Sequence, residues 1–274
     1  MSADVDYSGS GGNVPGSGGN VPASGGNVIE FRDVRLTVNG HKLIEGVNLT
    51  VKRGERLILL GRSGSGKTTT LKLINRLLEP SSGQILVEGK PTSDWDPIRL
   101  RRGIGYVIQE TGLFPHFTVE RNIATVPAIE GWRRERIRER VEHLMRLVGL
   151  DPRLASRYPA ELSGGQRQRV GVARALAADP PLLLMDEPFG ALDPITRVEL
   201  QREFRELQEK VGKTVVFVTH DLGEALFLAS RIGLFDTGRL TGVYTPQEFL
   251  SSRDPAVVAY RDCFRPLEGF GVAG

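Results

Sequence analysis

The strongest constraint on this chain is a glycine-rich loop, GRSGSGKTT at residues 61–69. Residues 56–60 before it form an apolar run that predicts a short buried strand. After the loop, apolar side chains recur at helical spacing, at Leu71, Leu73, Ile74, Leu77 and Leu78. The spacing G-x-x-x-x-G-K-[ST] between a strand and a helix is typical of a phosphate-binding loop. A glycine-rich turn that contains a lysine by chance would not explain both the spacing and the flanks.

The backbone of such a loop supplies most of its chemistry. Glycines let successive N–H groups approach phosphate oxygens closely, and the N-terminus of the next helix adds partial positive charge. The Lys67 amine can reach the β- and γ-phosphates of a nucleotide, and the Thr68 hydroxyl can ligate Mg²⁺. We therefore expect nucleotide to contact the whole loop: Gly61, Arg62, Ser63, Gly64, Ser65, Gly66, Lys67, Thr68 and Thr69.

Composition narrows the possible classes of function. The 274 residues suffice for one large domain or two small ones with a substantial core. Basic and acidic residues nearly balance, at 36 against 33, so no dense basic surface for nucleic acid is expected. The single cysteine, Cys263, allows no internal disulfide and points to a reducing compartment. No signal peptide is visible and no apolar run approaches the roughly 20 residues that span a bilayer, so any membrane part would belong to another chain.

The N-terminal third divides into a tail and a predicted sheet. Residues 1–27 are rich in glycine and repeat SGGNVP, so we expect a flexible tail. Residues 29–34 and 47–51 alternate between apolar and polar side chains, with Asn39-Gly40 between them as a hairpin signal. With a further strand at residues 83–89, this pattern predicts a small antiparallel sheet beside the loop.

The middle of the chain is predicted to be helical. A helix should open at residues 118–123 with Thr118 as its cap, and a second should cover residues 132–148. The second has one apolar face and one face rich in arginine and glutamate. An anion or nucleic-acid patch is one interpretation of the charged face, but a solvated outer face explains it more simply.

The last part of the chain alternates apolar strands with helices. Strands are predicted at residues 104–108, 182–185, 215–218 and 232–235, with helices from Pro194 and over residues 222–229. Continuous apolar strands that alternate with helices predict a parallel sheet covered on both faces, which is an α/β fold.

Polar side chains follow several of these strands, at the sheet edge where ligands gather. Asp186 closes a buried strand, the position from which a carboxylate binds Mg²⁺ in phosphate-loop enzymes. Glu187, the next residue, can accept a proton from an attacking water. Gln109 offers an amide oxygen to the metal or the water, and His220 can donate to the γ-phosphate or orient the water. Each has a structural alternative taken singly, such as a carboxylate that caps a helix, but their order after a phosphate loop favours one catalytic site.

The segment LSGGQRQR at residues 162–169 identifies the class. With it, the chain resembles the ATP-binding-cassette (ABC) family over residues 28–250. The resemblance implies a P-loop NTPase with a RecA-like parallel sheet core, an antiparallel β subdomain and an inserted helical subdomain at about residues 112–165. The ATPase domain is expected at residues 28–262, followed by a C-terminal tail at 263–274. The family motifs correspond to residues 61–69 (Walker A), Gln109 (Q-loop), 162–166 (signature), 182–187 (Walker B), 190–193 (D-loop) and His220 (switch histidine).

The resemblance assigns a partner to the signature. Ser163, Gly164 and Gly165 precede an expected helix at residues 166–177, which gives a hydroxyl, free N–H groups and a helix N-terminus for an anion. In the family, this anion is the γ-phosphate of ATP held by the opposite subunit. The resemblance therefore implies a homodimer in which Ser163, Gly164, Gly165 and Gln166 complete the ATP site of the other copy.

Two positions depart from the family pattern. The family stacks adenine on an aromatic side chain, and the aligned residue here is Val38, which can pack against a base but cannot π-stack. We expect weaker adenine binding, or an aromatic side chain supplied from elsewhere. The D-loop begins with Gly190, where serine is usual, which is expected to loosen a contact across the dimer while Asp193 is retained.

Within the family, YVIQETGLFPHFTVERNI at residues 106–123 resembles the importer ATPases of osmoprotectants such as glycine betaine, carnitine and choline. Leu113, Phe114, Pro115 and Phe117 are expected to form an exposed apolar knob that receives a short helix of a membrane subunit, although Phe117 alone could equally belong to the subdomain core. Many members of this group carry a regulatory domain pair after the cassette. The residues after Leu250 are too few for one, so we expect no such regulation in this chain.

The resemblance implies an ATP- and Mg²⁺-dependent subunit at the cytoplasmic face of the cell membrane. It would couple ATP hydrolysis to solute uptake through a separate permease, to which a periplasmic or lipid-anchored solute-binding protein delivers the solute. Nucleic acid is not expected as a partner. The alternative is a soluble ABC ATPase that acts on nucleic acid or ribosomes. Such proteins carry a long coiled-coil insertion or two cassettes in one chain, and this sequence has neither. A phosphate-loop kinase would leave LSGGQ unexplained.

Overall fold

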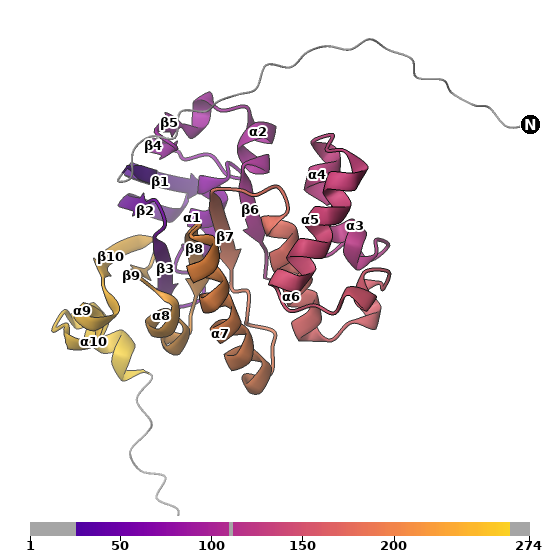
Figure 1. Cartoon of the computed structure of the whole chain (residues 1–274). Helices are drawn as coiled ribbons and strands as arrows, with labels where there is room; N and C mark the ends of the chain where they lie inside the picture. The colour runs from indigo at the N-terminus through magenta and orange to yellow at the C-terminus, as the bar shows by residue number, and fades with distance from the viewer. Residues whose placement is uncertain (1–25, 110–111, 264–274) are drawn as a thin grey trace, which may run out of the picture.

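A computed structural model describes residues 26–109 and 112–263, so residues 1–25 of the tail predicted at 1–27, and most of the predicted C-terminal tail, lie outside the described residues. Asn27, the last residue of the predicted N-terminal tail, already belongs to the first strand. The described part of the chain contains an antiparallel sheet, a second sheet that forms the core, and a helical lobe (Figure 1). None of the helices in this part of the chain is both long and apolar enough to cross a membrane.

The first sheet is antiparallel, as the alternating N-terminal segments predict. Its strands lie in the order β2-β1-β4-β5. Asn39 and Gly40 join β1 to β2 with φ values of 50° and 79°, the pair of positive angles that a tight hairpin turn requires. The bounds are β1 Asn27–Val38, β2 His41–Lys52, β4 Ser82–Val87 and β5 Lys90–Pro91.

The second sheet forms the core and has the order β10-β9-β3-β8-β7-β6. Neighbouring strands from β9 to β6 are parallel, which confirms the predicted α/β core. All side chains of β7 and β8 are buried, because helices or the first sheet cover both faces. The bounds are β3 Arg56–Gly61, β6 Ile104–Val107, β7 Leu182–Asp186, β8 Thr214–Thr219, β9 Arg231–Asp236 and β10 Arg239–Tyr244.

Alternate residues of β3 belong to two different hydrophobic clusters, one on each face of the core sheet. Leu57 and Leu59 of β3 pack with α1 and the antiparallel sheet, whereas Ile58 and Leu60 pack with the helices of the opposite face. The helices around the core are α1 Lys67–Ile74, α2 Pro97–Arg102, α6 Gly164–Leu176, α7 Pro194–Val211, α8 Leu222–Leu228, α9 Pro246–Ser251 and α10 Pro255–Asp262.

The helical lobe holds α3, α4 and α5, next to α6 and on the opposite side of the molecule from α9 and α10 (Figure 1). Thr118 caps α3 by accepting a hydrogen bond from the N–H of Arg121, as predicted. The lobe's helices are α3 Val119–Ile123, α4 Thr125–Ile129 and α5 Arg134–Leu147; short 3-10 turns occupy Thr92–Asp94, Pro152–Leu154 and Pro159–Glu161.

Three predicted features differ from the structure. The helix after the loop ends at Ile74 because Arg76 adopts a left-handed φ of 54°, so Leu77 leaves the apolar stripe and is 47% exposed. The signature helix begins at Gly164, two residues before its predicted start, because the Ser163 side chain caps it. The helix predicted over residues 132–148 covers only Arg134–Leu147.

Candidate active site

The phosphate loop connects β3 to α1 and owes its shape to glycines. Gly66 has a φ of 104°, and a Cβ there would lie 2.9 Å from the Ile44 side chain. A Cβ at Gly61 would collide with the backbone carbonyl of Phe235 on the neighbouring strand. The predicted glycine positions are therefore required by both backbone angle and close packing.

Lys67 lies beneath this loop and is 4% exposed. Its amine donates to the carbonyls of Gly61 and Arg62, at 2.8 Å each. Burial lowers the pKa of this amine, and the nearby carboxylates of Glu187 and Asp186 oppose that shift. The lysine is therefore a buried amine held by the loop. The negative charge of bound phosphates would stabilise its protonated form, as Glu187 and Asp186 already do in part.

Thr68 and Asp186 meet at the ends of α1 and β7. The Thr68 hydroxyl donates to an Asp186 carboxylate oxygen at 2.8 Å. Burial raises the pKa of Asp186, while the bond from Thr68 lowers it. These oxygens are the hard donors that Mg²⁺ prefers, which fits the metal role predicted for both residues.

Glu187 and His220 approach each other from β7 and β8. His220 Nδ1 lies 3.2 Å from Glu187 Oε2. Glu187 has a left-handed φ of 42°, and its backbone N–H donates to the carbonyl of Val218 at 3.0 Å. This turn directs the Glu187 side chain away from that of Asp186 and toward the histidine, so consecutive carboxylates serve different positions. The geometry suits a general base beside a group that senses the γ-phosphate.

A buried hydrogen-bond network was not predicted from the sequence. It lies beside the switch loop, the segment after β8 that carries His220 and Asp221. Thr219 Oγ1 donates to Glu224 Oε2 at 2.6 Å, and Gln201 Nε2 donates to the other carboxylate oxygen at 3.0 Å. Burial raises the pKa of Glu224, and the bond from Thr219 opposes the shift. The N–H of Asp221 in turn donates to Thr219 Oγ1 at 3.0 Å. Gln201 lies on α7 and Glu224 on α8, and the sequence does not show that these two helices bring the side chains into contact.

The phosphate loop, Glu187 and His220 surround one open pocket of ≈ 640 Å³, within the range of small-molecule sites. The residues that line it were mostly predicted, but Leu43, Tyr260 and Cys263 were not. Four predicted site residues are not among the described residues that line it: Val38, Gly61, Ser65 and Asp186. The lining residues are Leu43, Arg62, Ser63, Gly64, Gly66, Lys67, Thr68, Thr69, Gln109, Glu187, His220, Tyr260 and Cys263.

The described residues that line this pocket do not supply the aromatic side chain that was one of the two expectations for adenine. Val38 is 41% exposed and pairs with His41 at the tip of the hairpin, while Leu43 of β2 lines the pocket. Tyr260 is the aromatic side chain among the described lining residues, but it is 8% exposed and its hydroxyl donates to the His220 carbonyl. It is therefore not free to stack on a base.

The signature lies outside this pocket. The Ser163 hydroxyl accepts from the N–H of Gln166 at 3.2 Å, and the Gln166 side chain accepts from the N–H of Ser163 at 2.9 Å. This reciprocal capping box leaves the helix N-terminus of α6 on the surface. A Cβ at Gly165 would lie 2.9 Å from Thr196 of α7, which explains the second glycine by close helix packing. None of the four signature residues lines the pocket that the phosphate loop of their own chain forms.

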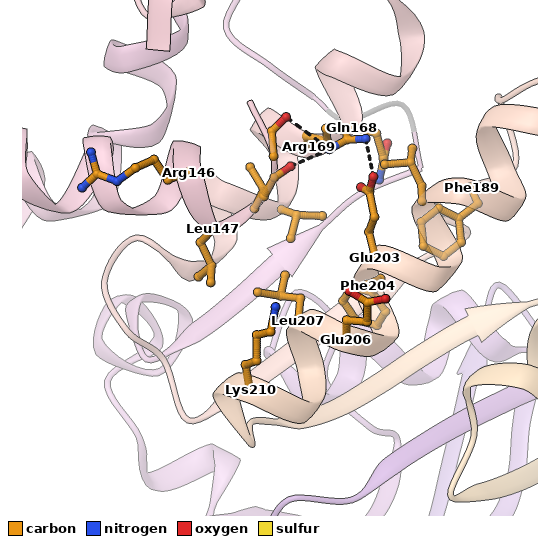
Figure 2. A pocket seen from close by; sticks show the side chains of 14 residues that line it. Arg146, Leu147, Gln168, Arg169, Phe189, Glu203, Phe204, Glu206, Leu207 and Lys210 are labelled. Atoms are coloured by element: carbon orange, nitrogen blue, oxygen red, sulfur yellow. Dashed lines mark hydrogen bonds and ion pairs between the residues drawn. The ribbon is translucent and has the colours of Figure 1, made fainter. Parts of the chain in front are cut away.

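Arg169 anchors the signature helix to two neighbours (Figure 2). Its guanidinium donates to the Val148 carbonyl at 2.9 Å and to Glu203 of α7 at 2.7 Å. Figure 2 shows the adjoining pocket of ≈ 230 Å³, lined by the end of α5, by α6 and by α7. None of the predicted nucleotide or catalytic residues lines it, so this pocket is not the reaction site.

A groove lies beside the predicted apolar knob, apart from the two pockets described above. Phe114 is 40% exposed and lines a groove of ≈ 350 Å³ with Tyr106, Ile108 and Arg174. Pro115 is also exposed, as predicted, but Leu113 packs against the core, contrary to the prediction. Phe117 is partly buried, which agrees with the alternative stated for that residue. The buried side chain of Asn122 causes this, since it bonds to the backbone of Phe114 and Phe117 and holds the loop against α3.

Comparisons with known proteins agree with this arrangement. The model of the ABC transporter family matches residues 44–190. A glycine betaine/carnitine/choline transport ATP-binding protein of Bacillus subtilis (strain 168) is 54% identical over 217 residues, which are 79% of this chain and 57% of that protein. A glycine betaine uptake system ATP-binding protein of Escherichia coli (strain K12) is 50% identical over 82% of this chain and 73% of its own length. This chain therefore spans little more than half of the Bacillus relative.

A solved structure shares the fold. The ATP-binding cassette MJ0796, in a dimeric post-hydrolysis state bound to ADP and Pi, superposes with a TM-score of 0.72 and 34% sequence identity. The superposition covers 80% of this chain and 98% of that one. The parallel core sheet and the antiparallel sheet of this chain, together with this superposition, confirm the predicted ABC cassette fold.

Proposed function

Because this chain belongs to the ABC transporter family, we propose that it hydrolyses ATP as the nucleotide-binding subunit of an importer. The observation that carries the proposal is the arrangement of Lys67, Thr68, Glu187 and His220 around one pocket. Lys67 and the loop would bind the phosphates, and Glu187 would accept a proton from the attacking water. His220, within 3.2 Å of Glu187, would hold the water and the γ-phosphate in line.

Mg²⁺ fits the oxygen donors of this site. Thr68 and Asp186 would hold it, with Gln109 as a third ligand. Among the described residues, no cluster of three or more His, Cys, Asp and Glu side chains could hold a metal alone. This fits Mg²⁺, which in such sites takes one or two protein oxygens together with substrate phosphates. When bound, the ion would offset the negative charge of the phosphates.

The complete ATP site would form between two copies. The signature residues Ser163, Gly164, Gly165 and Gln166 do not line the pocket of their own chain. Ser163 is exposed, Gly164 and Gln166 are half-buried, and Gly165 is buried. A helix N-terminus with free N–H groups favours an anion such as the γ-phosphate. The related cassette MJ0796 is described as dimeric with ADP and Pi, which supports the same assembly here. ATP would then hold the two copies together until it is hydrolysed.

The transport partner would be an integral-membrane permease at the cytoplasmic face of the cell membrane. The groove beside Phe114 offers an exposed aromatic edge, flanked by Arg101, Arg102 and Arg174, to a short helix of that permease. The relatives named for glycine betaine, carnitine and choline transport support a quaternary amine as the solute. A solute-binding protein would deliver it to the permease. No observation favours nucleic acid or ribosomes as partners.

Two measurements test this function. The purified chain should hydrolyse ATP, and its specific activity should rise with protein concentration as dimers form. Co-expressed with a permease that co-purifies with it, it should drive ATP-dependent uptake of labelled glycine betaine, carnitine or choline into vesicles.

The docking step has a matched control. Phe114→Asp should abolish co-purification with the permease without changing ATP hydrolysis by the isolated chain. Phe227→Asp changes an equally apolar side chain, 37% exposed on α8 and outside the groove, and should retain the permease. Absence of ATP turnover would reject the enzymatic proposal; turnover with no uptake of any of the three amines would reject the solute class.

A further inference from the structure

The C-terminal helix α10 reaches the catalytic pocket from the far end of the described chain. It follows β10 and α9 at the edge of the core (Figure 1). Its N-terminus is capped by Asp254, which also accepts a hydrogen bond from Tyr244 at 3.2 Å. Near its other end, Tyr260 and Cys263 line the same pocket as the phosphate loop. The motifs of the site assign nothing to this helix.

Tyr260 makes a specific contact with the switch loop. Its hydroxyl donates to the backbone carbonyl of His220 at 2.7 Å, and its side chain is buried. Burial raises the pKa of Tyr260, and the negative charge of Asp221 adds to the shift. The phenol therefore stays protonated throughout the neutral range and remains a donor.

The backbone of His220 needs such an anchor because its ring is loosely held. The His220 side chain is 58% exposed, and its Nδ1 atom lies 3.2 Å from Glu187 Oε2. On one side of the loop, the N–H of Asp221 donates to Thr219. On the other side, the His220 carbonyl accepts from Tyr260. The two bonds together fix the peptide from which the histidine ring projects into the pocket.

We propose that Tyr260 is a positioning residue for His220, and that α10 thereby sets the alignment of the switch histidine with Glu187 and the γ-phosphate. Tyr260 takes no part in proton transfer. This inference rests on the proposed ATP hydrolysis, because it concerns the rate of that reaction.

Tyr260→Phe removes the hydroxyl and keeps the buried ring, so α10 should remain packed through residues such as Val257. We expect kcat for ATP to fall about three- to tenfold, the worth of one hydrogen bond in a transition state, with KM and ATP binding unchanged. Tyr244→Phe is the matched control, because it removes a tyrosine hydroxyl that contacts Asp254 at the start of the same helix. Its kcat should equal that of the unchanged chain.

A double-mutant cycle separates positioning from structural support. In a His220→Ala background, Tyr260→Phe should have no further effect on kcat, because there is no histidine to position. Equal fold-losses in the presence and absence of His220, or an unchanged kcat in Tyr260→Phe, would overturn the inference. If the unchanged chain itself fails to turn over ATP, the proposed function fails instead, so the two failures are distinguishable.

Discussion

Thr68 and Asp186 are 118 positions apart in the sequence, and the hydroxyl of one donates to the carboxylate of the other at 2.8 Å. The contact joins the first turn of α1 to the last residue of β7. It brings together the phosphate loop and the strand that leads to Glu187, so the proposed metal-binding oxygen and the proposed general base belong to adjacent residues. The left-handed backbone of Glu187 separates their directions.

Glu187→Gln should leave ATP binding intact and reduce turnover. The amide keeps the shape of the side chain but cannot accept a proton, so we expect kcat to fall by about 10²–10⁴, the usual contribution of a general base. Steady-state hydrolysis and equilibrium binding of a fluorescent ATP analogue measure the two effects separately. Full turnover in this variant would remove Glu187 from the role of base.

Ser163→Arg should block ATP-dependent dimerisation while a single copy still binds nucleotide. Ser163 is exposed and caps the N-terminus of α6, and arginine would remove the cap and fill the space in which we propose that the γ-phosphate of the other copy binds. Size-exclusion chromatography with Mg-ATP, using the Glu187→Gln chain to slow hydrolysis, reports the dimer. A double variant that dimerises with ATP as the single Glu187→Gln chain does would disprove the sandwich arrangement.

Much of this site could be predicted because its chemistry is encoded locally. The glycine spacing around Lys67 reflects backbone angles within a few residues, and the apolar strand before Asp186 places that carboxylate at the sheet edge. Even the early start of α6 was present in the sequence, since Ser163 and Gln166 have the spacing of a capping box.

The contacts that could not be predicted connect distant elements. Tyr260 belongs to a short amphipathic helix, and its pattern gives no reason to place the hydroxyl on the loop after β8. Leu43 lies in β2 before the alternating segment at residues 47–51, and that pattern does not show which pocket the side chain reaches. Leu113 was assigned to an exposed knob because the sequence does not show that Asn122 holds the loop against the core.

Val38→Tyr should tighten ATP binding. A tyrosine on the hairpin tip could stack on adenine, and such stacking is worth about 1–3 kcal/mol per base in sites that rely on it. We expect KM for ATP to fall at least several-fold with kcat unchanged. Val198→Tyr, at an exposed position on α7 outside the pocket, is the control. An unchanged KM in Val38→Tyr would mean that the base does not lie against this hairpin.

Arg169→Ala should cost more stability than Glu203→Gln. The ion pair is partly exposed, with 21% and 47% of the two side chains accessible, so its loss alone should cost no more than about 1 kcal/mol. Removing the guanidinium also leaves the Val148 carbonyl without that donor, which adds about 1–3 kcal/mol. Urea unfolding of both variants measures the difference. Equal losses would show that the bond to the lobe contributes nothing.

Glu224 should make the stability of the fold depend on pH in a defined direction. Burial raises its pKa in the folded chain, so the folded state binds this proton more tightly than the unfolded state does. The contribution of Glu224 to stability is then fully present below the unfolded-state pKa and is lost as pH rises through the raised folded-state pKa.

Glu224→Gln should therefore abolish this loss of stability between the two pKa values. The amide cannot accept from both Thr219 and Gln201, so the variant should start less stable by about 1–3 kcal/mol, but its profile should be flatter over that window. Glu199→Gln, which changes an exposed carboxyl on α7, should keep the slope of the unchanged chain. Urea unfolding at intervals from mildly acidic to neutral pH gives the three slopes. If the Glu224→Gln profile runs parallel to that of the unchanged chain, Glu224 has the same proton affinity in both states.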